Sequence, residues 1–245
     1  MKSLKIYSWL ILAFLWAPLL MVLKKGLSIE SFSGLFRSLE IFDALGHSAL
    51  LGLGTSIFST LIATMTVFAA RGLGKTAKLA LSIGMVLPLV LPEIAFGLSF
   101  LVWFQYLGLS LGWTTLLLAH IAFTLPFGLL VMHASMARFH PEPIDAARDL
   151  GAKPLNVFRH GVLPQIIPSL LTAFVLSFSL SFDDFLVTFF VKGIDQVTMP
   201  IKIYSMIRLK VGTEIYALSV LLFLISVACV LMTQLWLLKS QKRLQ

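Results

Sequence analysis

Hydrophobic residues gather along this chain into six long runs, and short connections between them hold most of the charged side chains. At about 1.5 Å of rise per residue, each run is long enough to cross a hydrocarbon core roughly 30 Å thick. The pattern predicts an all-α, polytopic membrane protein with six transmembrane helices in a single domain, residues 1–245. The runs cover about residues 6–23, 44–70, 79–104, 113–133, 165–190 and 215–238.

Local signals refine four of these runs. Lys24 and Lys25 follow the first run without a small-x-small cleavage pattern, so a retained span is favoured over a signal peptide. Proline is expected to interrupt the third run at Pro88 and Pro92 and the fourth at Pro126. Small residues at four-residue spacing in the second run indicate a surface for close helix packing; they are Ser48, Gly52, Ser56, Thr60 and Thr64.

Composition and charge exclude several classes of protein. With 58% hydrophobic residues, 12% charged residues and a mean hydropathy of +0.96, the chain is too apolar for an ordinary soluble domain. The net charge of +8 comes from basic residues scattered at the ends of the apolar runs. No basic block is present, so the expected surroundings are membrane lipid and not nucleic acid. The single Cys229 excludes an internal disulfide.

Six spans place both termini on the same side of the membrane. If that side is the cytoplasm, 12 of the 19 Lys and Arg residues lie inside. The excess of basic residues favours cytoplasmic N- and C-termini, because positive loops tend to stay inside. The polar connection at about residues 137–164 is then also cytoplasmic.

This connection has the pattern of two short helices joined by a turn. Pro143 suits a first helical turn, Asp145 favours the positive end of the helix dipole, and Gly151 supplies a left-handed stop. Pro154 opens a second helix, which is expected to close near Leu163 because a proline follows. The first helix has a narrow apolar face formed by Ile144, Ala147 and Leu150.

The loop carries a family pattern. Asp145-Ala146-Ala147, Gly151 and Leu163-Pro164 resemble the EAA loop of ABC-transporter permeases, the MetI-like inner-membrane components of binding-protein-dependent transport. The resemblance implies a type I ABC importer permease fold. It also implies that this EAA-like loop, with Glu142, Asp145, Ala146, Ala147, Gly151, Leu163 and Pro164, docks on a cytoplasmic ATPase subunit. Asp145 replaces the usual Glu and shortens the acidic side chain by one methylene.

Two further stretches, residues 176–184 and 199–206, resemble spermidine/putrescine permeases of the PotC type. This resemblance implies an importer in the bacterial cytoplasmic (inner) membrane. Its expected partners are a second, PotB-like permease in a heterodimer, two PotA-like ATP-binding subunits and a periplasmic, PotD-like polyamine-binding protein. The chain has no Gly-x-x-x-x-Gly-Lys-Ser/Thr loop, so ATP and Mg are expected in the partner ATPase, and no cofactor is expected in this chain.

Three acids fall inside the predicted spans: Glu93, Asp183 and Asp184. A carboxylate at the bilayer centre costs about 2.5–3.5 kcal/mol, so each is expected to face a protein interior or a watery path. From the helical rise, all three are expected to converge in the outer half of the membrane and to attract a passing organic polycation. The structural alternative is that Glu93 occupies the first turn of a helix restarting after Pro92, and that the Asp pair caps a helix break.

The alternatives to polyamine transport are an ABC permease for another small solute, such as an anion or a metal, and a membrane protein without a transport function. A permease for an anion is expected to carry Arg or Lys at the acid positions, and none stands there. A membrane-embedded enzyme would require a paired nucleophile and base, which this sequence lacks. A subunit that only anchors an ATPase would not need acids within the membrane. His120 is interpreted as a hydrogen-bonded packing residue, because no second His or Cys stands at metal spacing, so no metal site is expected.

Overall fold

The computed structural model describes residues 2–209, 212, 214–221 and 223–224. The chain divides into two compact units, Asp43–Ile201 and Met1–Phe42 with Lys202–Gln245. The prediction of a single domain over residues 1–245 stays a prediction. In the described part the elements are α1 (Lys2–Gly26), α2 (Ile29–Arg37), α3 (Leu39–Ala69), a 3₁₀ turn (Ala70–Gly72), α4 (Lys75–Val90), α5 (Glu93–Tyr106), α6 (Trp113–Met136), α7 (Glu142–Asp149), α8 (Pro154–Val157), a π turn (Phe158–Val162), α9 (Leu163–Phe182), α10 (Leu186–Val191) and α11 (Met199–Leu209).

The all-α prediction is confirmed: the elements assigned in the described residues are all helical. Four helices there are long and apolar enough to cross a membrane, and they contain residues Trp9–Gly26, Leu39–Gly72, Trp113–Met136 and Pro154–Phe182. The bent pair α4 and α5 makes a fifth if it counts as one span. Most of the sixth predicted span, residues 215–238, lies outside the described residues.

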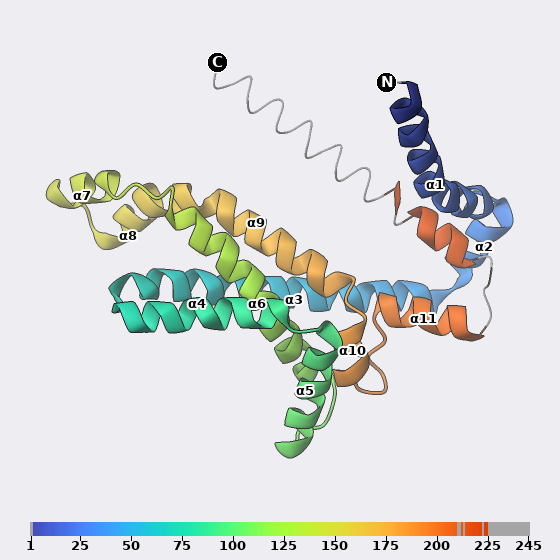
Figure 1. The fold of residues 1–245 in the computed structure, drawn as a ribbon. Helices are drawn as coiled ribbons and strands as arrows, with labels where there is room; N and C mark the ends of the chain where they lie inside the picture. The colour runs from blue at the N-terminus through green and yellow to red at the C-terminus, as the bar shows by residue number, and fades with distance from the viewer. Residues whose placement is uncertain (1, 210–211, 213, 222, 225–245) are drawn as a thin grey trace. The chain divides into compact units, whose positions relative to one another are not determined.

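The larger unit is a helix bundle (Figure 1). Helices α3, α4, α6 and α9 contribute to one apolar cluster, which includes Ala63, Met85, Met132 and Ala173. A second cluster joins α3, α5, α6 and α10 around Phe104, Leu116 and Val187. Helices α7 and α8 lie at one end of the bundle, and α5 and α10 lie at the other (Figure 1).

The small residues of the second apolar run pack as predicted. Ser48, Gly52, Ser56 and Thr60 are buried on α3. A Cβ added at Gly52 would lie 3.0 Å from the ring of Phe178 on α9, and Ser177 Oγ donates to Ser59 Oγ over 3.5 Å. The two helices approach closely because small side chains line their contact.

The smaller unit contains α1, α2 and the beginning of α3. Ser28 caps α2 by accepting a hydrogen bond from the Ser31 N–H over 3.3 Å. Lys25 lies over the ring of Tyr216, 5.1 Å from its centroid. Glu40 on α3 forms an ion pair with Lys202 on α11.

Prolines interrupt one predicted span and not another. The chain bends by 108° between α4 and α5, and α5 begins at Glu93 directly after Pro92, as predicted. The predicted interruption at Pro88 is wrong, because α4 continues through this proline to Val90. The predicted interruption at Pro126 is wrong, because α6 continues through this buried proline without a break. Thr124, in the same turn, donates its hydroxyl to the carbonyl of His120 over 2.9 Å. Such side-chain bonds and close helix packing help a membrane helix to accommodate proline.

The fifth predicted span, residues 165–190, is broken where one helix was expected. Helix α9 ends at Phe182, and α10 begins at Leu186. Helix α10 packs tightly on α5: a Cβ added at Gly97 would lie 3.1 Å from Val187 Cα and 3.2 Å from Leu186 O. The helix breaks at residues 91–92 and 183–185 therefore both lie beside the contact between α5 and α10.

Candidate functional site

The three predicted intramembrane acids come together at these two breaks. Glu93 lies in the first turn of α5, and Asp183 is the C-cap residue of α9. The side chain of Glu93 interacts electrostatically with both Asp183 and Asp184, and the two aspartates interact with each other. The predicted convergence is therefore present in the structure as a cluster of three carboxyl groups.

Asp184 has a structural role within this cluster. Its Oδ2 accepts hydrogen bonds from the Thr188 N–H at 2.8 Å and the Thr188 hydroxyl at 2.9 Å, and its Oδ1 accepts from the Val187 N–H at 3.3 Å. These are the free donors at the beginning of α10, which a carboxylate satisfies. Asp184 is 4% exposed. This geometry matches the capping alternative for Asp184 and explains why the helix breaks before Leu186.

His120 on α6 completes the hydrogen bonding around Asp184. The imidazole is fully buried, with Nε2 3.0 Å from Thr188 Oγ1 and 3.4 Å from Asp184 Oδ2. Its Nδ1 lies 2.8 Å from Ser181 Oγ. A proton on Nε2 can be donated toward Asp184 and Thr188. The Ser181 hydroxyl beside Nδ1 also donates to Thr55 Oγ1 over 3.3 Å. The packing interpretation of His120 agrees with this network, but its partners lie too far away in sequence to be predicted.

Glu93 and Asp183 are placed differently. Asp183 is exposed and Glu93 is half-buried, so both carboxyl groups can reach a ligand. Among the described residues, no Lys or Arg forms a salt bridge with any of the three acids. Like charges at close range repel one another, so the cluster favours a cation that compensates them.

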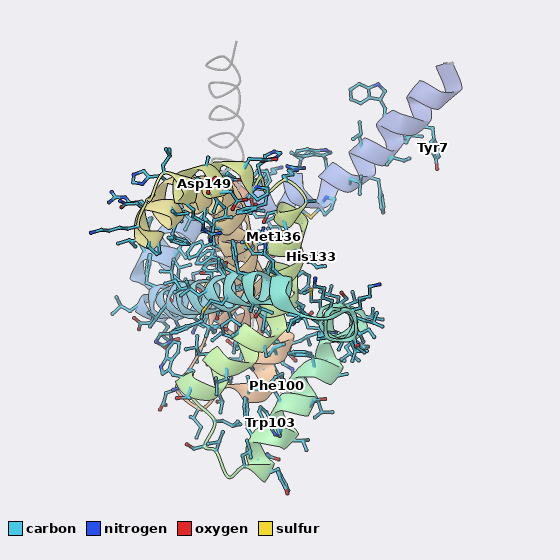
Figure 2. The ribbon with its side chains drawn as sticks, turned by 90° about the vertical axis from the view of Figure 1, so that its left-hand side faces the viewer. Tyr7, Phe100, Trp103, His133, Met136 and Asp149 are labelled. Atoms are coloured by element: carbon cyan, nitrogen blue, oxygen red, sulfur yellow. The ribbon has the colours of Figure 1, made fainter. Side chains whose placement is uncertain are left out.

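Aromatic side chains follow Glu93 along α5. The ring of Phe96 packs against Phe100 and Phe123, with centroid distances of 5.0 and 5.7 Å. Figure 2 shows Phe100 and Trp103 together on α5, where their centroids are 5.9 Å apart. Most of these rings are committed to one another and to the core.

The EAA-like loop has the predicted helix, turn and helix. Glu142 and Asp145 occupy the first turn of α7, with exposed side chains, and Gly151 has the left-handed φ of +74° that the turn requires. Ala146 is exposed and Ala147 is half-buried. The loop thus presents an accessible surface with small and acidic side chains.

The apolar face of α7 is split between two environments. Ile144 is buried, and a Cβ added at Gly161 would lie 3.3 Å from its Cγ1. Leu150 is 88% exposed and Leu155 on α8 is 74% exposed. Two large apolar side chains therefore point away from the loop.

The second loop helix does not close at Leu163. Helix α8 ends at Val157, and the π turn Phe158–Val162 leads directly into α9, which begins with Leu163 and Pro164. Proline fits there because the N–H groups of the first turn have no helical partner. The Leu-Pro pair therefore begins a membrane helix where the sequence pattern indicated an end.

Two loop contacts were not predicted from sequence. Gln165 accepts from the His140 N–H at 2.9 Å and donates to the carbonyls of His140 at 3.1 Å and Gly161 at 2.7 Å. Arg71, after α3, lies over the ring of Phe139, 4.1 Å from its centroid. Both contacts join the loop to the bundle, and neither has a local sequence signal.

Comparison with known proteins agrees with this architecture. Residues 62–243 match the family described as binding-protein-dependent transport system inner membrane component. The spermidine/putrescine transport system permease protein PotC of Escherichia coli (strain K12) is 33% identical over 211 residues, which cover 86% of this chain and 80% of PotC.

Further similarities are of the same kind. The putrescine transport system permease protein PotI of Escherichia coli (strain K12) is 31% identical over 231 residues, covering 85% of this chain and 81% of PotI. A solved structure of the MetNI methionine ABC transporter in inward-facing conformations has a TM-score of 0.59 at 16% identity, covering 84% of this chain and 95% of that chain. This likeness supports the MetI-like fold. The chain belongs to the family of binding-protein-dependent transport system inner membrane components.

Proposed function

We propose that this chain is the permease subunit of an ATP-binding-cassette importer that carries polyamines, such as spermidine or putrescine, across the bacterial cytoplasmic membrane. The named relatives are polyamine permeases. The observation that carries the proposal is the convergence of Glu93, Asp183 and Asp184 without a salt bridge to Lys or Arg in the described residues. A polyamine supplies the positive charges that this cluster lacks.

Glu93 and Asp183 are the acids that line the substrate path in this proposal. Both are accessible, whereas Asp184 is buried and occupied by the donors of α10. Asp184 contributes its charge to the cluster and holds the break that separates α9 from α10. The different roles proposed for Asp184 and for the other two acids follow from their exposure and hydrogen bonding.

The EAA-like loop is the proposed contact with a separate ATPase subunit. Its support is the exposed surface formed by Asp145, Ala146 and Leu150, which α7 carries beyond the bundle (Figure 1). ATP and Mg bind in the partner, and this chain transmits the motion. Coupling requires that the ATPase states differ in affinity for two permease conformations.

The complete importer is proposed to contain a second permease of the PotB type, two PotA-like ATPases and a PotD-like periplasmic binding protein. The N- and C-termini are cytoplasmic in this arrangement. Among the described residues, α1 and α3 supply two of the candidate spans that such a multi-pass subunit requires.

The proposal is tested by ATP-dependent uptake of radiolabelled spermidine into liposomes that contain the chain and the products of neighbouring genes. Glu93→Gln and Asp183→Asn keep the shape of each side chain and remove its charge. We expect each to lower uptake at least tenfold while ATP hydrolysis and assembly persist. Asp184→Asn is less informative, because it also weakens the cap of α10.

Asp195→Asn is the matched control, because Asp195 is an exposed acid in the loop that follows α10. This variant is expected to transport normally. Normal uptake by both Glu93→Gln and Asp183→Asn would refute the proposed path. Absence of polyamine uptake by the wild-type importer would refute the substrate class.

A further inference from the structure

A cavity of about 270 Å³ opens between the 3₁₀ turn after α3, the beginning of α4 and the end of α6. Three basic side chains line it: Arg71, Lys78 and His133. No acidic side chain is among the described residues that line it. The cavity is therefore a basic site within the larger unit, away from the acids at the helix breaks.

The rest of the cavity lining is mostly apolar. Val67, Leu81, Met85 and Met136 contribute to it, and Figure 2 shows His133 and Met136 near each other on α6. Lys78 and Met85 are about 10 Å apart along the axis of α4. The cavity lining on α4 therefore changes from charged to apolar within that distance. A ligand that fits this lining has an anionic end and an apolar end.

The volume limits which part of the ligand enters. Small-molecule sites usually measure about 300–1,000 Å³, so this cavity lies just below that range. Outside it, α4 exposes large apolar side chains, including Leu79 (61%), Ile83 (57%) and Leu87 (60%). A compact anionic headgroup fits the cavity, while its acyl chains lie in the bilayer beside the apolar surface of α4.

We propose that this cavity binds the headgroup of an anionic phospholipid from the cytoplasmic leaflet. The site lies in that leaflet because residues 71–78 are cytoplasmic in the proposed function, on which this placement rests. Arg71 and Lys78 attract the phosphate, His133 adds a polar ring, and Ser82 lies one turn after Lys78 in the lining. Basic pockets between membrane helices on the cytoplasmic side are known to suit such headgroups.

The larger cavity beneath the EAA-like loop, of about 420 Å³, is a poorer candidate for an anion. It also contains Arg71, but its lining includes Asp145, which pairs with Arg148 over 3.6 Å. The negative charge of Asp145 already compensates the basic lining there. Charge complementarity thus favours the smaller of these two cavities. A third cavity, of about 450 Å³, contains one basic residue, Arg138, whereas the smaller cavity contains three.

Bound lipid also has a mechanical consequence. Arg71 is shared between the two cavities and lies over Phe139, which leads from α6 into the loop. A headgroup that binds Arg71 therefore interacts with the same side chain that packs over Phe139 and connects the loop to the end of α3. Anionic lipid is therefore expected to tune the attachment of the loop.

The test is native mass spectrometry of the full-length chain, purified with its transporter subunits and titrated with phosphatidylglycerol or phosphatidylcholine. We expect phosphatidylglycerol to bind at least fivefold more tightly. Arg71→Gln and Lys78→Gln are each expected to weaken phosphatidylglycerol binding about fivefold, the change that corresponds to one basic residue near an anionic leaflet.

Lys75→Gln is the matched control, because Lys75 lies on the same helix one turn earlier and does not line the cavity. Equal losses in Lys75→Gln and Lys78→Gln, or equal binding of the two lipids, would overturn the proposal. Glycerol phosphate that bound as tightly as phosphatidylglycerol would identify a soluble-phosphate site and would overturn the lipid assignment. Because this readout needs no transport, it is separable from failure of the polyamine proposal.

Discussion

Asp183 and Asp184 are neighbours with identical side chains, yet their environments are opposite. Asp183 is exposed at the end of α9, and Asp184 is buried under the first turn of α10. Hydrogen-bond donors make the difference, because the free N–H groups of α10 require one acceptor and only one of the two side chains reaches them. At the scale of single residues, the acidic cluster is one structural acid and two accessible ones.

The network around Asp184 predicts a strong effect at His120. His120→Ala removes one hydrogen-bond partner each from Ser181 and Thr188 and leaves a buried cavity beside a carboxylate. We expect the free energy of unfolding to fall by about 2–4 kcal/mol. The measurement is thermal denaturation of the purified chain, followed by size-exclusion chromatography after heating.

His160→Ala is the control for this substitution. His160 is exposed and bonds only to the carbonyl of Asn156 within its own turn, among the contacts described. Its effect is expected to stay within about 0.5 kcal/mol. Equal midpoints for the two variants would show that the His120 network does not stabilise the fold.

At the scale of elements, two broken helices meet through a glycine. Gly97 lets α5 approach the backbone of α10, and the two breaks bring Glu93 toward Asp183 and Asp184. A straight fifth helix would carry residues 184–190 away from α5. The breaks are therefore what assembles the acidic cluster.

Gly97→Val tests this contact. The added Cβ would lie 3.1 Å from Val187 Cα and 3.2 Å from Leu186 O. Because both are backbone atoms, neither can rotate away. Overpacking of this kind costs about 1–3 kcal/mol. We expect a lower denaturation temperature and, because the acids separate, reduced polyamine uptake.

The matched substitution is Gly84→Val on α4, where an added Cβ meets nothing within 4 Å. This variant is expected to remain within about 0.5 kcal/mol of the wild type. If Gly97→Val behaved in the same way, the close approach of α5 and α10 would not be required for the fold.

Local signals decided which elements were predictable. Proline before Glu93 and glycine at 151 act within their own turns, so the start of α5 and the end of α7 were predicted correctly. The break before Leu186 depends on Asp184 and on His120, which is far away in sequence, so the sequence offered it only as an alternative to a continuous helix. Pro126 gave the opposite error, because its surroundings accommodate a residue that usually breaks helices.

The same distinction applies to the candidate site. The three acids were identified because a charged residue in an apolar run is costly, which is visible in sequence alone. Their separate roles were not visible, because burial and capping depend on tertiary contacts. Spacing placed Leu150 on one apolar face with Ile144, but Ile144 is buried and Leu150, the C-cap residue of α7, is 88% exposed.

At the scale of the whole molecule, α6 separates two polar surfaces. Its first turn is fastened to the end of α10, where the Thr115 hydroxyl donates to the Val191 carbonyl over 3.0 Å. Its last turn leads into the EAA-like loop. The 24 residues of α6 span about 36 Å, enough to place these ends on opposite sides of a membrane.

Cysteine labelling tests this topology. In a Cys229→Ser background, Asp149→Cys lies on α7 and Asp195→Cys lies in the loop after α10; both positions are exposed. Figure 2 shows Asp149 in the loop region. An impermeant maleimide is expected to label position 195 in right-side-out vesicles and position 149 in inverted vesicles. Labelling of both positions from one side would contradict the proposed orientation.

The contact between α5 and α10 also has a consequence for biogenesis. Glu93 and Gly97 leave the ribosome long before Val187, by roughly 5–20 s at ordinary rates of synthesis. During that interval α5 has no α10 to pack against, and the carboxyl group of Glu93 has no neighbouring aspartates. The nascent α4–α5 segment therefore lacks these contacts until the later helix is made. The acidic cluster is thus one of the last features of the larger unit to be assembled.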